Sequence, residues 1–72
     1  HGEQTAMTIV YQGRDVETDA TTVAGFLAAQ GVDPARAIVE YGGEVHAPGA
    51  DLADVALRPG VALDVFQLTA GG

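Results

Sequence analysis

The chain has 72 residues and a net charge of −7, with ten acidic and three basic side chains and no cysteine. A chain this short buries only about 60% of the surface that its unfolded form exposes, so we expect one domain with a thin core and no deep substrate cleft. The composition excludes disulfides and a thiolate metal site, and it disfavours nucleic acid, whose phosphates bind clustered lysine and arginine. No apolar run approaches the ~18 residues of a membrane span. We therefore expect a module that meets protein partners, with neither nucleic acid nor a membrane among them.

The first predicted structure is a β-hairpin. Residues 7–11, Met-Thr-Ile-Val-Tyr, alternate in polarity and are rich in β-branched and aromatic side chains, which favour a strand. Gln12-Gly13 is a turn signal, and residues 14–17 return as a second strand.

A short helix is predicted over residues 23–30. Residues 18–22 supply several candidate N-cap side chains, Gly31 is a typical stop signal, and Pro34 prevents simple continuation. Helical spacing predicts three apolar residues on the face that packs against the sheet, namely Val23, Phe26 and Leu27.

Two more strands are predicted at residues 37–41 and 44–46, joined by a tight Gly42-Gly43 turn. Residues 51–54 are expected to form a single helical turn that places Leu52 in the core. After a strong Pro-Gly turn, residues 61–68 are predicted to be the last and longest strand.

This order of elements, β-β-α-β-β-β, predicts an α+β fold of the β-grasp, or ubiquitin-like, kind, in which one main helix packs across a mixed sheet of about five strands. We interpret residues 1–6, which precede Met7, as a tag remnant or a disordered extension. Residues 7–72 are then one domain, with a flexible tail at residues 69–72.

The tail, Thr69-Ala70-Gly71-Gly72, is the clearest functional signal. Glycine has no Cβ, so a Gly-Gly end can enter a narrow channel in a partner, and a terminal carboxylate on a flexible tail is accessible to that partner. The alternative interpretation is a frayed end or a cloning remnant. The position of the Gly-Gly end directly after a terminal strand favours the functional interpretation.

Residues 65–72, Val-Phe-Gln-Leu-Thr-Ala-Gly-Gly, resemble the C-terminal signature of the ThiS family of the ThiS/MoaD superfamily, the sulfur carriers of thiamine biosynthesis. Residues 38–45 are similar to that family's strand-turn-strand, and residues 57–60 to the turn before its last strand. The chain departs from the family where Gly42 replaces a more usual asparagine and where no basic residue stands beside Pro48. These departures bear on which pathway receives the sulfur.

The resemblance implies a carrier protein and not an enzyme, with no catalytic residue, metal ligand or bound cofactor of its own. A ThiF/MoeB-like adenylating enzyme would use ATP to activate the carboxylate of Gly72, and sulfur would replace AMP to leave a thiocarboxylate. Ala70, Gly71 and Gly72 would enter the partner's active site, and a synthase such as thiazole synthase would accept the sulfur. The absence of disulfides fits a cytoplasmic location.

Alternation in the last strand predicts a contact surface for these partners. If Val61, Leu63 and Val65 face the helix, Phe66 and Leu68 lie on the opposite face. There, beside the tail, they would form an exposed apolar patch. The alternative is that the twist of the strand end returns Phe66 to the core.

Other interpretations stay open at this point. The acidic side chains are either a solubilising surface or a means of steering toward a basic dock on a partner, and we interpret His46 as a surface strand histidine and not a general base. The same carrier chemistry also serves molybdopterin, cysteine or homocysteine, and sulfur-containing natural products. A non-covalent β-grasp binding module and a ubiquitin-like modifier are alternatives of another class.

Overall fold

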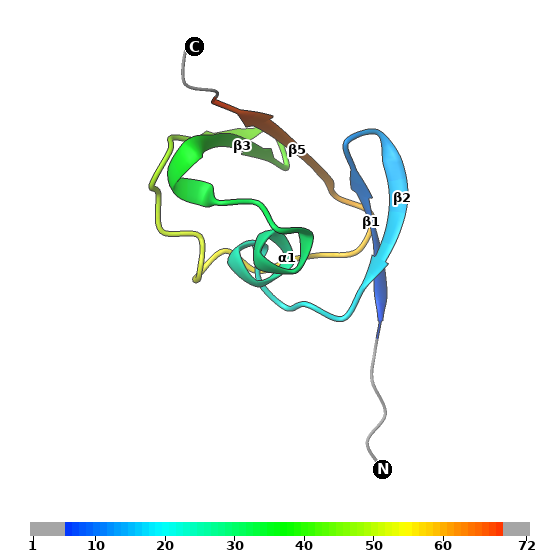
Figure 1. Cartoon of the computed structure of the whole chain (residues 1–72). Helices are drawn as coiled ribbons and strands as arrows, with labels where there is room; N and C mark the ends of the chain where they lie inside the picture. Colours follow the sequence, from blue (N-terminus) through cyan, green and yellow to red (C-terminus); the bar gives the residue numbers. More distant parts are fainter. Residues whose placement is uncertain (1–5, 69–72) are drawn as a thin grey trace.

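The computed structural model describes residues 6–68, which form one five-stranded mixed sheet and one α-helix in an α+β arrangement (Figure 1). The central strand is β5, which runs parallel to β1 and antiparallel to β3 in the order β2-β1-β5-β3-β4. In chain order, the elements are β1 (Met7–Tyr11), β2 (Arg14–Thr18), α1 (Val23–Gln30), a 3-10 helix η1 (Pro34–Arg36), β3 (Ala37–Tyr41), β4 (Glu44–His46) and β5 (Ala62–Gln67).

Both hairpins close on two residues with positive φ. These are Gln12 and Gly13 between β1 and β2, at 53° and 80°, and Gly42 and Gly43 between β3 and β4, at 59° and 87°. Positive φ at both central residues is the mark of the type I′ turn, whose twist matches that of the flanking strands. The two turns predicted from the sequence are confirmed.

The predicted limits of α1 are also confirmed. Thr22 is the N-cap, and its Oγ1 accepts a hydrogen bond from the Gly25 N–H at 3.1 Å. At the other end Gly31 adopts φ 77° and donates to the Ala28 carbonyl. Pro34 then begins η1, a short 3-10 helix that was not predicted from the sequence.

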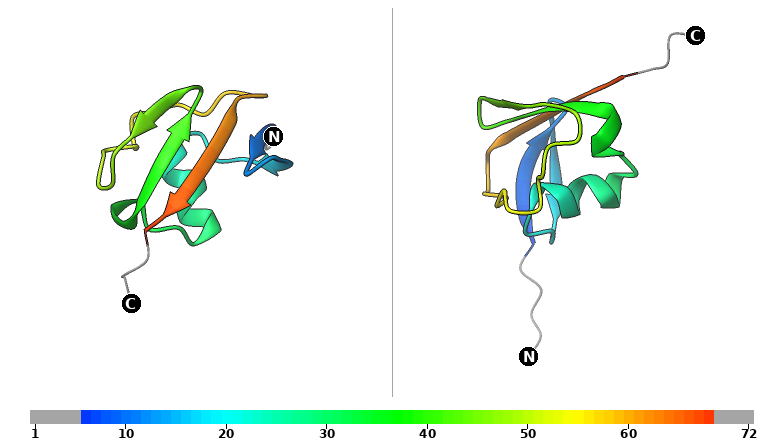
Figure 2. Two further views of the ribbon diagram at one scale, coloured as in Figure 1. Left: turned by 90° about the horizontal axis from the view of Figure 1, so that it is seen from above. Right: turned by 90° about the vertical axis from the view of Figure 1, so that its left-hand side faces the viewer.

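The core lies between α1 and one face of the sheet (Figure 2). Val23, Phe26 and Leu27 are fully buried, as helical spacing predicted. The ring of Phe26 meets Tyr11 of β1 edge-on, with centroids 4.9 Å apart and planes at 76°. The remaining buried residues come from the strands and loops around the helix: Ile9, Val32, Ala37, Val39, Tyr41, Leu52, Leu57, Leu63 and Val65.

Residues 51–54 form no helix, but a single turn is closed here by the Val55 N–H, which donates to the Leu52 carbonyl at 3.3 Å, and Leu52 is buried as expected. The backbone here is also engaged by α1, because the Leu52 carbonyl accepts from Ala24 N–H at 3.2 Å and the Val55 carbonyl from Val23 N–H at 2.9 Å. These are two of the donors that the first turn of a helix leaves unpaired. The segment therefore caps α1 through a turn that is not part of a helix.

The last strand is shorter than the predicted residues 61–68. Val61 precedes β5 because its N–H closes the preceding turn on the Arg58 carbonyl at 3.4 Å. Leu68 follows the strand, yet its N–H still donates to the Arg36 carbonyl at 2.8 Å. β2, by contrast, extends one residue beyond the prediction, to Thr18.

Candidate functional site

The sheet face opposite α1 is the main uncovered surface of the described chain. In Figure 2, β3, β4 and β5 lie side by side in the left view with α1 behind them, and no helix of residues 6–68 covers their front. Strand alternation and register assign ten residues to this outer face: Thr8, Val10, Asp15, Glu17, Ile38, Glu40, Val45, Ala62, Asp64 and Phe66.

Phe66 and Leu68 are exposed at the end of β5, at 54% and 47% of their surface. Leu63 and Val65 of the same strand are buried on the inner face. The predicted alternation is therefore confirmed, and Phe66 does not return to the core. Its register partner on β3 is Ile38, which lies half-buried beside it. Phe66, Leu68 and Ile38 form what we call the apolar patch.

The backbone around the apolar patch is held on both sides. The Leu68 N–H donates a hydrogen bond to the carbonyl of Arg36, which precedes β3. The backbone N–H and carbonyl of Val65 are both hydrogen-bonded to the side-chain amide of Gln12, which follows β1. Nothing in the local sequence indicated the second contact, because its partners lie 53 positions apart. The side chains of the patch are thus presented from a strand with fixed neighbours.

Val45 is the most exposed large apolar side chain of the described residues, at 69%. This exposure was not predicted from the sequence, because alternation over the three residues of β4 does not distinguish the two faces of the sheet. The register between β3 and β4 places Val45 directly opposite Glu40, on the outer face. It is an exposed apolar side chain on β4, the edge strand of the sheet.

The predicted tail residues Ala70, Gly71 and Gly72 lie outside the described residues, as does most of the predicted extension at residues 1–6. What the structure describes is the position from which the tail sequence follows, namely Leu68 after the central strand β5.

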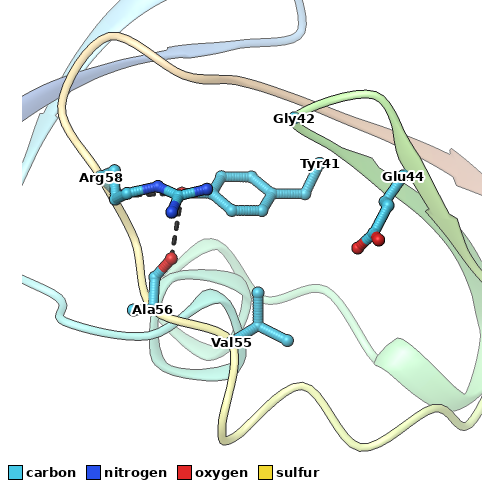
Figure 3. Close-up of a pocket in the computed structure, with 6 residues that line it drawn as sticks. All are labelled: Tyr41, Gly42, Glu44, Val55, Ala56 and Arg58. Atoms are coloured by element: carbon cyan, nitrogen blue, oxygen red, sulfur yellow. Dashed lines mark hydrogen bonds between the residues drawn. The ribbon is translucent and has the colours of Figure 1, made fainter.

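A cavity of about 370 Å³ lies beside the second hairpin (Figure 3). Glu44 points into it from one side and Arg58 from the other. The hydroxyl of Tyr41 at its wall donates to the Ala56 carbonyl at 3.0 Å and accepts from the Arg58 N–H at 2.8 Å. Both of these interactions fix the loop that leads into β5, so the Tyr41 hydroxyl has a structural role.

His46 is half-buried and not a surface residue as predicted, with 20% of its side chain exposed. Its register partner is Val39, a buried residue, so it lies on the inner side of β4. Its Nε2 is buried without a hydrogen-bond partner and stands 3.9 Å from the nearest Glu44 carboxylate oxygen. Within residues 6–68, no three histidine or acidic side chains are arranged to hold a metal ion.

Comparison with known proteins finds no relative of this chain. No protein-family model matches it, and neither a curated protein nor a solved structure is significantly similar to it. In the described part of the chain, no helix is long and apolar enough to cross a membrane.

Proposed function

We propose that this chain is a sulfur carrier protein of the ThiS type, with a β-grasp fold and the carboxylate of Gly72 as its reactive group. One observation carries the proposal: the sequence Thr69-Ala70-Gly71-Gly72 follows Leu68, which comes directly after the central strand β5 and belongs to the exposed apolar patch. A site supported by a rigid element is presented to a partner in a defined position. β5 is such an element, because it has a strand on each side.

The arrangement of the described elements supports the β-grasp part of the proposal. A β-hairpin is followed by one helix, two further strands form a second hairpin, and the last strand returns to the middle of the sheet. The helix α1 packs across one face only, and no helix of the described residues covers the other face.

The proposed chemistry begins when the Gly72 carboxylate attacks the α-phosphorus of ATP in a ThiF/MoeB-like enzyme, forming an acyl adenylate and releasing pyrophosphate. The terminal sulfur of an enzyme persulfide then attacks the acyl carbon and displaces AMP. A thiol attacks the sulfur that remains on the enzyme, forms a disulfide with it and releases the Gly72 thiocarboxylate. The chain has no cysteine, so its own side chains offer no alternative place for this sulfur.

Phe66 and Leu68 are the proposed contacts with the adenylating enzyme. Both are exposed and lie within six residues of the proposed reactive carboxylate. A buried aromatic anchor at a protein interface commonly contributes about 2 kcal/mol or more to binding. The sulfur acceptor we propose is a thiazole synthase, following the resemblance of the tail to the ThiS family.

Intact-mass spectrometry tests the proposal directly. Incubation with ATP, sulfide and a purified ThiF/MoeB-like enzyme should raise the mass of the chain by the difference between sulfur and oxygen. A variant that lacks Gly71 and Gly72 should show no gain. An equal gain in the truncated variant would contradict the proposal.

The same experiment distinguishes the alternative classes. A non-covalent binding module would bind its partner with no change of mass at all. A ubiquitin-like modifier would instead appear in higher-mass conjugates with lysines of other proteins.

A further inference from the structure

The charged side chains on the outer face of the sheet are all negative. Four carboxylates lie on it, two from β2 and one each from β3 and β5, namely Asp15, Glu17, Glu40 and Asp64. None of the three arginines of the chain alternates onto this face, because Arg14 lies opposite Tyr11 in the inner-facing register, Arg36 is in η1, and Arg58 precedes β5.

Glu40 and Asp64 are directly opposite each other in the register of β3 and β5. Side chains in this relation have Cβ atoms about 4.5–5.5 Å apart, and like charges there destabilise a sheet. Both residues are only half-exposed, so water screens them less than it would at an open edge. No arginine forms an ion pair with either carboxylate in the described part of the chain. The isolated domain therefore places two carboxylates at directly opposite positions, and no arginine pairs with either of them in the described part of the chain.

Apolar side chains adjoin this acidic pair on both sides. Val45 on β4 lies opposite Glu40, and Phe66 is the next residue of β5 on the same face as Asp64. Val45 and Phe66 are both more than half exposed. A surface that buries these groups must therefore also meet the two carboxylates, and burying a charge without a partner is strongly unfavourable.

We propose that this outer face docks a basic protein surface, whose arginine or lysine side chains neutralise Glu40 and Asp64 while apolar side chains beside them cover Val45 and Phe66. The inference deepens the proposed function and rests on it for the identity of the partner, the adenylating enzyme. Charge complementarity of this kind raises the association rate, and the apolar contacts slow dissociation.

Charge complementarity also excludes the other occupants of this face. A second copy of the chain, docked symmetrically, would bring the same four carboxylates against one another. Nucleic acid and an anionic membrane surface carry charge of the same sign as the face. A basic protein surface removes the repulsion between Glu40 and Asp64 and covers the apolar groups in one step.

The test compares single substitutions that each remove one negative charge. Glu40→Gln and Asp64→Asn change the proposed pair, and Asp54→Asn, at an exposed loop residue without a hydrogen-bonding role among the described contacts, is the matched control. The first probe is a short peptide of alternating arginine and valine, titrated into the labelled domain by NMR. The second probe is the purified adenylating enzyme, with association rates measured at low and high salt.

For the peptide, we expect the largest amide shifts in β3 and β5. Glu40→Gln and Asp64→Asn should each raise Kd about threefold or more, whereas Asp54→Asn should change it less than about twofold. Shifts spread evenly over the acidic loops, or an equal effect of Asp54→Asn, would overturn the inference. So would a lower Tm in both pair variants, because the carboxylates would then serve folding.

For the enzyme, both pair variants should associate more slowly than wild type at low salt and depend less on salt. If wild type is adenylated while the pair variants associate as the Asp54→Asn control does, the inference is wrong and the proposed function stands. If the peptide binds the predicted face but wild type is never adenylated, the face is supported and the carrier function is wrong.

Discussion

The side-chain amide of Gln12 continues the sheet where β1 ends, by bonding to both backbone groups of Val65. Its Nε2 donates to the Val65 carbonyl at 3.1 Å, and its Oε1 accepts from the Val65 N–H at 2.8 Å. The pairing of β1 with β5 extends only to Tyr11 and Leu63, so the amide takes the place of the next strand residue. Gln12 thereby ties the first hairpin to the backbone directly before Phe66.

Replacing Gln12 with alanine should lower the free energy of unfolding by about 1–2 kcal/mol, because the backbone groups of Val65 lose both partners. Amide hydrogen exchange at Val65 should become faster than in wild type. Denaturant unfolding and exchange spectra measure the two effects. Gln67→Ala, at an exposed glutamine of the same strand, is the control and should leave both nearly unchanged. Equal behaviour of the two variants would show that the amide does not hold β5.

The hydroxyl of Tyr41 gives a second prediction. It bridges the Ala56 carbonyl and the Arg58 N–H, which both belong to the loop before β5. Tyr41→Phe keeps the ring and removes the two hydrogen bonds, so we expect a loss of about 1 kcal/mol of stability, since the exposed loop groups can bond to water instead. Thermal melts measure the loss, and faster exchange of the Arg58 amide should accompany it. A stability equal to that of wild type would contradict this role.

The parts of the fold that the sequence predicted correctly depend on local interactions. The limits of α1 follow from Thr22 and Gly31 at its ends, and the limits of β3 and β4 follow from the glycine turn between them. Residues 51–54 form a single hydrogen-bonded turn and not the predicted helical turn, and the Leu52 carbonyl also bonds to Ala24 in the first turn of α1, almost thirty residues earlier in the chain. No local pattern contains that contact.

In the candidate site too, the features that depend on local sequence were predicted and those that depend on distant strands were not. The exposure of Phe66 and Leu68 follows from alternation within one strand and was predicted. The opposition of Glu40 to Asp64 and the link from Gln12 to Val65 depend on the register between distant strands, which the sequence alone does not specify.

The second hairpin offers a test at Gly42, where the resemblance to the ThiS family leads us to expect asparagine more often. Gly42 has φ 59°, a value that asparagine adopts more readily than other residues, and a Cβ there would meet Val61 Cγ1 at an ordinary 3.5 Å. Gly42→Asn should therefore keep the fold and stabilise it by up to about 1 kcal/mol, because the unfolded chain loses freedom. Thermal melts should show a higher Tm. Gly43→Val, with a β-branched residue at φ 87°, should lower it; a lower Tm for both would refute the expectation.

Stability at alkaline pH should depend on Tyr11. Its ring packs on Phe26, and desolvation by burial raises the pKa of its phenol above the ordinary value of 10.0. The folded state thus holds this proton more tightly than the unfolded chain does. The contribution of Tyr11 to stability is complete below about pH 10 and is lost as the pH rises through the raised pKa. Between neutral and alkaline pH, wild type should lose more free energy of unfolding than Tyr11→Phe, and parallel pH curves would contradict this.

Phe66 and Val65 are adjacent residues of β5 on opposite faces of the sheet, and they provide a matched pair of substitutions. Val65 is 6% exposed and contributes to the core, whereas Phe66 is 54% exposed. Phe66→Ala should cost less than about 0.5 kcal/mol of stability, as surface substitutions usually do. Val65→Ala should cost more, because it removes buried methyl groups and leaves a cavity.

Binding should show the reverse order. If Phe66 is an anchor for the adenylating enzyme, its removal should weaken affinity roughly thirtyfold, which corresponds to about 2 kcal/mol. Val65→Ala, compared at a temperature at which it is fully folded, should bind nearly as wild type does. Thermal melts and a binding titration on these two variants are sufficient. Should Phe66→Ala bind with unchanged affinity, the exposed aromatic ring is not a contact of this partner, and the proposed docking surface loses its apolar centre.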